Sequence, residues 1–447
     1  MIKGAPKTWC RTPTLEIDEN RSAWVAEQPS YQPLPPLLGS ESADVAVVGG
    51  GFTGASAAWH LSRRFPKLRI VLLEARTLGS GASGRSGGQA LTGINGVAPA
   101  EGERARRIYE VTKQGIDLIA QLTAEHSLDA GFSRRGCLEV FTTARTAEAA
   151  HERVEKGARA GIPVRWLPGS SLAIRGAMGA ILDPAAGRVN GVGLLRGLRE
   201  LLVERGVTIW EGTPAVAIEE GPEVRVATPK GEVRARALVL ATNAYGTALG
   251  YFRSGILPLH SHVLATAPLS EAEWDGLGWG EYDGFSDDRD RVAYGSRTAG
   301  GRMIFGGGSN HAYAYSYGGR TVFSAPATRS FEVIHRRLVE YLPGLSGVPI
   351  EHRWTGTVDL TLDRVCSMGV CGASRNVYYA VGYSGHGVAL AMVAGRVLCD
   401  LYAGDHGPWR DLPFYQKPLP AFPPEPLRWM GYQLYTRLTG RSPRRGT

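Results

Sequence analysis

A glycine-rich turn lies between a short apolar run and a helical pattern, and it limits this part of the chain to few folds. Residues 44–48 form an apolar run of the length typical of a buried parallel strand. Gly49, Gly51 and Gly54 follow in the pattern G-x-G-x-x-G, and a helical pattern then covers residues 53–65. A second apolar run at 70–73 completes a strand–helix–strand unit. Such glycines permit a tight turn, close approach of a ligand to the backbone, and packing of the helix on the strand.

The chemistry of this segment predicts a dinucleotide ligand. The start of a helix offers unpaired N–H groups and the positive end of the helix dipole to phosphate groups. Glu74 ends the second apolar run, twenty residues after Gly54. Its carboxylate can accept hydrogen bonds from ribose hydroxyls and would repel a 2′-phosphate. FAD or NAD is therefore favoured over NADP.

Two further glycine-rich clusters favour FAD over NAD. Residues 79–88 read GSGASGRSGG, and a loop of successive backbone N–H groups can cover the remainder of a long cofactor. Residues 382–387 read GYSGHG and lie between a predicted strand at 377–381 and a predicted helix at 388–401. A second helix N-terminus suits an electron-rich flavin ring, whereas an NAD protein has no use for it.

These motifs, with ATNA at 241–244 and RMIFGGG at 302–308, resemble the D-amino-acid oxidase/glycine–sarcosine oxidase superfamily of FAD-dependent oxidoreductases, in its gamma-glutamylputrescine oxidase-like branch. The resemblance spans about residues 40 to 405. It implies a Rossmann-like FAD-binding domain with a mostly parallel sheet, and a second α+β domain on a mixed or antiparallel sheet. It also implies an enzyme that oxidises the C–N bond of a primary or secondary amine or amino acid by hydride transfer to flavin N5. The resulting imine would hydrolyse to a carbonyl product, and O2 or a quinone would accept the electrons.

The pattern along the chain predicts a discontinuous arrangement of domains. The expected parts are an N-terminal arm at 1–41, an FAD-binding domain from 42–98, 183–252 and 351–404, a substrate-binding domain from 99–182 and 253–350, and a C-terminal tail with an amphipathic helix at 405–447.

The candidate site residues come from the glycine-rich clusters, from the strand ends beside them, and from the resemblance. The predicted cofactor-binding residues are Gly49, Gly51, Phe52, Thr53, Gly54, Glu74, Ala75, Arg76, Gly81, Ala82, Ser83, Arg85, Ser86, Gly87, Gly88, Gln89, Ala215, Thr242, Asn243, Trp354, Gly356, Gly382, Ser384, Gly385, His386, Gly387 and Val388. The predicted catalytic residues are Tyr294, Trp354 and His386, because aromatic and imidazole groups above a flavin would desolvate an amine and stabilise a cation. His260, His262, Tyr313, Tyr315 and Tyr317 are further candidates, although packed core aromatics are the more common use of such residues. No metal site is expected.

Four positions depart from the family pattern as the resemblance implies it. Sarcosine-type members attach the flavin through a Cys, and the matching position here is Gly356; another branch uses a His where this chain has Arg85. Non-covalent FAD is therefore expected. A Lys that pairs with the carboxylate of small amino acids is replaced by Ala389, and the Lys associated with oxygen activation falls near Ile304. The first of these two departures argues against sarcosine or glycine as the substrate. The second argues against efficient use of oxygen as the electron acceptor.

The charge and cysteine patterns limit which binding partners and which cellular compartment are expected. The formal net charge of +8 is spread along the chain without the basic, aromatic patch that a nucleic-acid interface needs, so no nucleic-acid partner is expected. Five Cys form no C-x-x-C pair, and no secretory signal is visible, so a cytoplasmic location is expected. The uncharged stretch at 376–395 contains several glycines and polar residues, which fits a strand, a turn and a buried helix better than a membrane span.

The C-terminal segment has two interpretations. Leu427, Met430, Leu434 and Leu438 are at helical spacing and predict a helix that docks on the catalytic body. The same helix, with Arg441, Arg444 and Arg445 beyond it, would also suit peripheral contact with the inner face of a membrane.

Three alternative functions stay open at this stage. A 2-hydroxy acid dehydrogenase would keep the fold but need a His as base. A flavin-binding subunit could serve assembly or electron transfer without a substrate of its own. A plain NAD dehydrogenase would use only the first glycine cluster.

Overall fold

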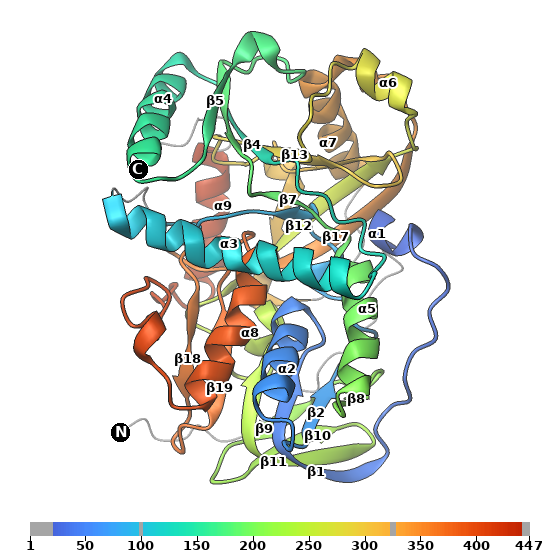
Figure 1. Ribbon diagram of the computed structural model, residues 1–447, viewed down its shortest axis with the longest axis vertical. Coiled ribbons are helices and arrows are strands. Elements are labelled where there is room, and N and C mark those ends of the chain that lie inside the picture. Colours follow the sequence, from blue (N-terminus) through green and yellow to red (C-terminus); the bar gives the residue numbers. More distant parts are fainter. Residues whose placement is uncertain (1–20, 98–101, 322–327, 440–447) are drawn as a thin grey trace.

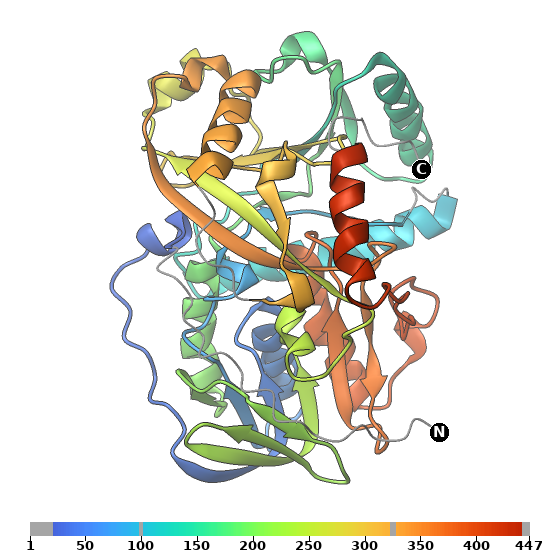
Figure 2. The same cartoon turned by 180° about the vertical axis from the view of Figure 1, so that it is seen from behind.

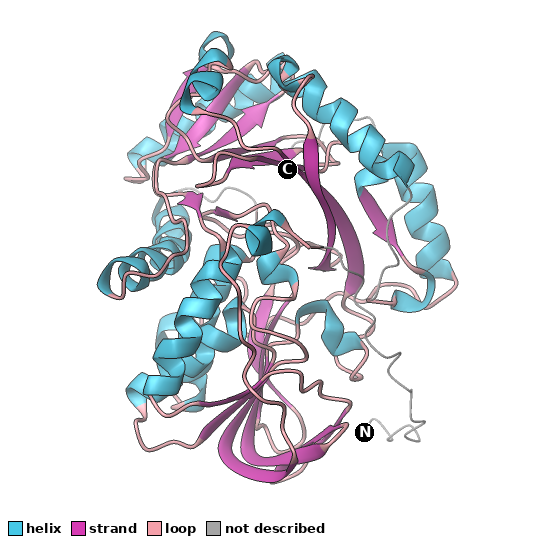
Figure 3. Cartoon of the chain, turned by 90° about the vertical axis from the view of Figure 1, so that its right-hand side faces the viewer, coloured by secondary structure: helices cyan, strands magenta, loops and turns pink. Residues whose placement is uncertain are grey.

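The computed structural model describes residues 21–97, 102–321 and 328–439. Two large β-sheets in this part of the chain form the centres of two domains, one above the other in Figure 1. Figure 3 shows the strands of the two sheets in separate layers with helices packed around them. The predicted two-domain α/β fold is therefore confirmed.

The first sheet has the mostly parallel arrangement that the apolar runs predict. Its parallel strands, in spatial order, are β19 (Val377–Val381), β11 (Gly231–Leu240), β1 (Gly39–Val48), β2 (Ile70–Leu73) and β8 (Thr208–Trp210). Antiparallel strands extend it: β18 (Ser367–Cys371) at the β19 edge, and the β9–β10 hairpin (Ala217–Glu219 and Val224–Thr228) beside β11. All four residues of β2 are buried, because helices cover one face of the sheet and side chains of the β9–β10 hairpin pack on the other.

Glycines let the helices approach closely around this sheet. α2 (Phe52–Arg64), α5 (Gly191–Glu204), α8 (Val388–Tyr402) and α3 (Gly102–Glu125) cover one face, and α3 crosses the middle of the molecule in Figure 1. A β-carbon on Gly395 of α8 would lie 2.2 Å from Ser56 Oγ of α2, and one on Gly115 of α3 would lie 2.0 Å from the Ala389 carbonyl oxygen. The helices therefore meet backbone to backbone, which fixes the start of α2 beside the start of α8.

The second sheet is mixed and mainly antiparallel, as predicted. Its strands are β4 (Cys137–Phe141), β5 (Arg165–Pro168), β6 (Gly179–Asp183), β12 (Leu257–Thr266), β13 (Gly284–Asp287), β14 (Tyr294–Arg297), β15 (Met303–Gly306), β16 (Tyr313–Tyr315) and β17 (Ile350–Leu360). β4 and β13 form its parallel pair. Its helices are α4 (Ala144–Arg159), α6 (Glu271–Gly276) and α7 (Thr328–Tyr341). A separate two-stranded sheet pairs β3 (Gln89–Ala90) with β7 (Gly187–Arg188).

One predicted domain boundary divides a strand from its sheet. The boundary at 351 puts β17 in the FAD-binding domain, yet β17 pairs along its whole length with β12 of the second sheet. We propose that this boundary lies after Leu360, at the end of β17.

The described part of the N-terminal arm holds the second glycine cluster. A short helix, α1 (Ala23–Ala26), places Trp24 so that its Nε1 donates to the Ser86 carbonyl at 2.8 Å. Ser22 Oγ donates to the Gly84 carbonyl at 2.7 Å. Residues 1–20 of the predicted arm lie outside the described residues, and β1 begins at Gly39, five residues before the predicted strand.

The C-terminal helix α9 (Leu427–Thr439) docks on the second domain, as Figure 2 shows. Asn310 Nδ2 donates to the Thr436 carbonyl at 2.5 Å, and the Tyr432 ring lies 5.7 Å from the Tyr315 ring. The helix therefore docks on the catalytic body as predicted, but the face expected to dock is wrong: Leu427, Met430, Leu434 and Leu438 stay exposed, and Tyr432 and Thr436 make the contacts. Arg441, Arg444 and Arg445 lie outside the described residues. Within the described ranges, every helix is too short or too polar to cross a bilayer, and residues 376–395 form β19, a loop and the start of α8.

Candidate active site

A cavity of about 3130 Å³ lies between the two domains and collects most of the predicted site residues. This volume is several times that of a small-molecule pocket, so it can hold a long cofactor and a substrate together. The predicted residues that line it are Gly49, Gly51, Phe52, Thr53, Glu74, Ala75, Arg76, Gly81, Ala82, Ser83, Arg85, Ser86, Gly87, Gln89, Ala215, Thr242, Asn243, Tyr294, Gly356, Ser384, Gly385, His386, Gly387 and Val388.

The start of α2 fits a pyrophosphate. Gly51 is the N-cap residue and supplies no capping side chain, so the first amides of the helix lack that usual partner. The Phe52 amide is an exception, since it donates to Ser83 Oγ at 3.0 Å. A β-carbon on Gly81 would meet nothing within 4 Å, which shows that the backbone of the second glycine cluster borders open cavity. Exposed amides and the helix dipole together favour an anion here.

Glu74 has the geometry for ribose hydroxyls. Its Oε2 accepts from the Gly50 amide at 2.7 Å and its Oε1 from the Arg76 amide at 3.0 Å. Each carboxylate oxygen can accept a further hydrogen bond. Burial raises the pKa of Glu74, and the two backbone donors oppose that shift.

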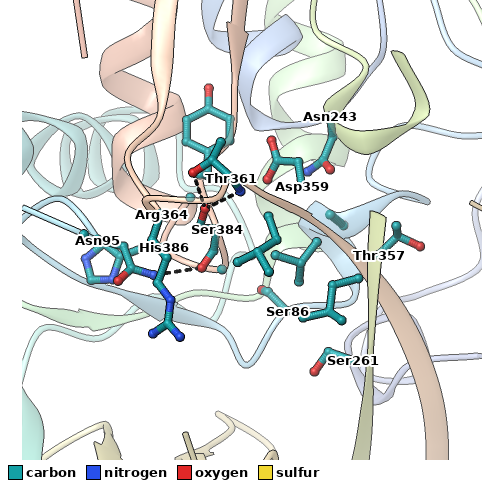
Figure 4. A pocket seen from close by; sticks show the side chains of 18 of the residues that line it. Ser86, Asn95, Asn243, Ser261, Thr357, Asp359, Thr361, Arg364, Ser384 and His386 are labelled. Atoms are coloured by element: carbon teal, nitrogen blue, oxygen red, sulfur yellow. Dashed lines mark hydrogen bonds between the residues drawn. The ribbon is translucent and has the colours of Figure 1, made fainter. Parts of the chain in front are cut away.

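The third glycine cluster is held firmly at the start of α8 (Figure 4). Asn95 Nδ2 donates to the Ser384 carbonyl at 2.9 Å, and His386 Nε2 donates to the Thr92 carbonyl at 2.8 Å. Gly387 caps α8 without a side-chain hydrogen bond, so the positive end of this helix also borders the cavity. The arrangement suits the electron-rich ring of a flavin.

Asp359 of β17 holds the third glycine cluster, a contact that sequence reasoning missed. It is 1% exposed, lines the cavity, and accepts a hydrogen bond from the Gly382 amide at 2.6 Å. Burial raises its pKa to about 6, and the amides of Gly382, Tyr383 and Ser384 act in the opposite direction. An aspartate inside a predicted strand carries no local signal of this role, because its partners lie more than twenty residues away.

Tyr294 and Gln89 both line the cavity. The Tyr294 hydroxyl lies 3.1 Å from Ser261 Oγ, and burial raises its pKa to about 12, so the phenol stays neutral. Gln89 Nε2 donates to the carbonyls of Phe285 and Gly295 at 2.9 and 3.2 Å. Its Oε1 is buried without a partner among the described residues, which leaves an acceptor for a ligand N–H or O–H group.

Four predicted residues do not line the cavity: Gly54, Gly88, Gly382 and Trp354. The three glycines support the loops, because a β-carbon on each would lie within 2.5 Å of a neighbouring atom. Trp354 is fully buried in an apolar cluster, and its Nε1 donates to the Arg85 carbonyl at 2.9 Å. The structure therefore makes Trp354 a support for the Arg85 loop, and the expected contact with substrate is corrected accordingly.

The two buried histidines of β12 are also packed away from the cavity. His262 Nδ1 lies 2.9 Å from Thr355 Oγ1, and His260 Nδ1 lies 3.2 Å from Thr357 Oγ1. Burial lowers the pKa of each to about 4, so both imidazoles are neutral near pH 7.

Comparison with known proteins agrees with this geometry. The family model described as FAD dependent oxidoreductase matches residues 44–401. The chain is 30% identical to a gamma-glutamylputrescine oxidoreductase of Escherichia coli over 421 residues, which covers 90% of this chain and 94% of that protein. It is also 30% identical to the probable oxidoreductase OrdL of Haemophilus influenzae over 395 residues, covering 83% and 85% of the two chains.

Solved structures with the same fold include the glycine oxidase from Geobacillus kaustophilus. Its TM-score is 0.71 at 20% identity, with 84% of this chain and 99% of that chain covered. The L-proline dehydrogenase from P. horikoshii has a TM-score of 0.67 at 21% identity, with 87% and 96% covered. The matched family model spans most of the chain, and its glycine-rich loops line one cavity. The chain therefore belongs to the family of FAD-dependent oxidoreductases, as an enzyme whose cofactor is FAD.

Proposed function

We propose that this enzyme oxidises the C–N bond of a primary or secondary amine or amino acid to an imine, which hydrolyses to a carbonyl product. The similarity to a gamma-glutamylputrescine oxidoreductase along 90% of the chain is the observation that carries the proposal. Bound FAD would supply the acceptor for the hydride that leaves the carbon next to nitrogen.

The side chains that line the cavity would orient the amine and keep water away from it. Tyr294 offers a neutral hydroxyl beside Ser261, and Leu91 and Ile94 contribute apolar surface. A wall of this kind disfavours a charged ammonium group and so favours the neutral amine that can lose a hydride. This chemistry needs positioning but no catalytic acid or base.

The histidines support an amine over a 2-hydroxy acid. Oxidation of a hydroxyl group calls for a base such as His. His260 and His262 are buried and do not line the cavity, and the Nε2 hydrogen of His386 is directed at the Thr92 carbonyl. The hydroxy acid dehydrogenase is therefore the second candidate.

We propose further that the FAD is bound without a covalent link. Gly356 offers no thiol, and a β-carbon there would lie 3.1 Å from the Cβ of Arg85. Cys366 is 1% exposed and does not line the cavity. Acid precipitation of the purified protein is expected to release all of the FAD into the supernatant.

An anaerobic substrate panel tests the proposed reaction. The FAD-loaded protein is mixed with primary amines, secondary amines, amino acids and 2-hydroxy acids, and loss of the oxidised flavin band is followed. Bleaching by at least one amine or amino acid, and by no hydroxy acid, is expected. Bleaching by hydroxy acids alone would transfer the assignment to the second candidate. No bleaching by any compound, with a firmly bound partner protein, would favour a non-catalytic flavin subunit.

The electron acceptor is O2 or a quinone. Ile304 is fully buried beside Trp354, so the position associated with oxygen activation offers no cationic group. Mixing the reduced enzyme with air-saturated buffer or with a soluble quinone compares the two reoxidation rates directly. We expect the quinone to reoxidise the flavin faster.

We propose a cytoplasmic location with peripheral contact between α9 and the inner face of the membrane. Met430 and Leu434 remain 55% and 58% exposed after the helix docks. Apolar side chains at this spacing can enter the lipid interface. The protein is expected to sediment with anionic phospholipid vesicles, and Met430→Glu with Leu434→Glu is expected to abolish sedimentation. Equal sedimentation of wild type and double variant would contradict the membrane role.

A further inference from the structure

Two tryptophans hold successive peptide groups of the second glycine cluster. Trp354 Nε1 donates to the Arg85 carbonyl at 2.9 Å, and Trp24 Nε1 donates to the Ser86 carbonyl at 2.8 Å. Both indoles are buried and belong to one apolar cluster. The carbonyls of Arg85 and Ser86 are therefore both directed toward this cluster.

The N–H groups of the same two peptide groups are directed away from the tryptophans. In a trans peptide group the C=O bond and the N–H bond of the next residue point in opposite directions. Trp354 therefore fixes the Ser86 amide, and Trp24 fixes the Gly87 amide. Neither amide donates a hydrogen bond to a residue that the structure describes, and both residues line the cavity. Two adjacent N–H groups of this kind suit an electron-rich ligand.

The peptide group before these two is satisfied within the protein. Ser22 Oγ donates to the Gly84 carbonyl at 2.7 Å. The Arg85 amide, which belongs to the same peptide group, donates to the Ala82 carbonyl at 3.1 Å. Ser22 therefore holds a peptide group that offers no N–H to the cavity.

The Gly87 end of the loop lies against the second domain. A β-carbon on Gly87 would lie 2.8 Å from Cδ2 of Tyr294 in β14, and its carbonyl accepts from Ser296 Oγ of the same strand at 2.5 Å. The start of α2, which fits the pyrophosphate, meets the loop earlier, at Ser83. The geometry therefore favours the flavin ring over the pyrophosphate as the partner of the Ser86 and Gly87 amides.

Trp24 is held in place by contacts of the N-terminal arm. Its carbonyl accepts from Asn190 Nδ2 at 2.9 Å, and a β-carbon on Gly88 would lie 2.4 Å from its Cζ2. The indole therefore packs directly on the loop whose carbonyl it binds. The arm precedes residues 44–401, which the family model matches, so this contact comes from outside the matched segment.

We propose that Trp24 is a positioning residue for the FAD: its hydrogen bond to the Ser86 carbonyl aims the Gly87 amide at the flavin ring. A reduced flavin ring carries negative charge, so an N–H group stabilises the reduced ring more than the oxidised ring. Trp24 thereby raises the midpoint potential of the bound flavin. This role is independent of which substrate the enzyme oxidises.

Two substitutions separate the hydrogen bond of Trp24 from its packing. Trp24→Phe keeps an aromatic six-membered ring and removes the N–H donor. Trp24→His removes the six-membered ring and keeps a donor, because imidazole Nε2 takes the place of indole Nε1. Both variants are expected to melt at a lower temperature than wild type, since each leaves a gap in the cluster.

The midpoint potential of FAD bound to the full chain, measured by anaerobic equilibration with a reference dye, distinguishes the two variants. Trp24→Phe is expected to lower it by about 30 mV, which corresponds to a tenfold loss of preference for reduced over oxidised FAD. Trp24→His is expected to keep the potential of wild type.

Two control variants lose a comparable hydrogen bond without freeing a cavity amide. Trp274 is 1% exposed, its Nε1 donates to the Gly301 carbonyl at 3.1 Å, and neither residue lines the cavity. Trp274→Phe therefore matches Trp24→Phe in chemistry. Ser22→Ala removes a hydrogen bond within the loop itself. Both controls are expected to keep the potential of wild type.

Three results would overturn the proposal: an unchanged potential in Trp24→Phe, an equal fall in Trp274→Phe, or an equal fall in Trp24→His. The last would show that packing of the indole, and not its N–H group, sets the potential. If Trp24→Phe cannot be loaded with FAD, the dissociation constants of FAD decide. Retention of FAD by Trp24→His then supports the hydrogen bond, and loss of FAD from both variants overturns it.

Discussion

Replacement of Gly54 by alanine is expected to leave the purified protein almost free of FAD. A β-carbon at this position would lie 1.9 Å from the Gly49 carbonyl oxygen and 3.2 Å from Val47 Cγ1. Both neighbours belong to β1 or the turn after it, and backbone cannot yield as a flexible side chain does. The start of α2 would therefore withdraw from the strand and carry its amides away from the pyrophosphate. Overpacking of this kind destabilises a fold by about 3 kcal/mol.

The flavin absorbance per mole of protein and the melting temperature measure this effect. Gly276→Ala is the control, since a β-carbon at the end of α6 meets nothing within 4 Å. We expect full FAD content and an unchanged melting temperature for the control. Stoichiometric FAD in Gly54→Ala, with the melting temperature of wild type, would show that helix–strand contact does not position the phosphate site.

Replacement of Asp359 by alanine is expected to detach the flavin loop and lower FAD affinity by more than tenfold. The carboxylate accepts from the Gly382 amide, and the amides of Tyr383 and Ser384 also lower its pKa. Each buried donor left without an acceptor costs about 1–3 kcal/mol, so a loss of about 3 kcal/mol in unfolding free energy is expected. Equilibrium dialysis for FAD and urea unfolding measure the two effects. FAD affinity equal to that of wild type would contradict the role of this residue.

The pH dependence of Asp359 gives an independent check. Burial raises its pKa from 3.8 to about 6 in the folded state, so the folded protein binds more protons than the unfolded chain between these values. The stabilisation that the group contributes is therefore complete below pH 3.8 and is lost as pH rises through about 6. Asp359 is expected to contribute about 3 kcal/mol in total to the change of unfolding free energy between pH 3.8 and about 6. Asp359→Asn is expected to lack this contribution, so its unfolding free energy changes less with pH. Identical slopes for wild type and Asp359→Asn would contradict the assigned pKa.

The local elements of the cofactor site were predictable because neighbouring residues determine them. Gly49, Gly51 and Gly54 follow one short apolar run and precede a helical pattern, and the structure contains β1, the turn and α2 at those places. Glu74 was identified in the same way, from its place at the end of β2. Spacing along the chain carries this information, because a turn and its flanking elements are contiguous.

Residues that act through distant partners were not predictable. Asp359 is two dozen positions from the amides that it holds, and Trp24 supports a loop sixty-two positions away. Trp354 shows the converse error, since an aromatic in the expected segment proved to be fully buried.

The FAD-binding βαβ unit and the two further glycine-rich loops follow from the amino-acid sequence alone, because turn geometry and hydrophobic period are local properties. Which side chains meet in the cavity depends on how the two domains pack. Burial and hydrogen bonding between the two sheets made Asp359 an anchor and His260 a neutral core residue. Docking of α9 placed Tyr435 beside Arg291. Contacts of this kind depend on the packing of segments far apart in the chain, which no pattern of adjacent residues encodes.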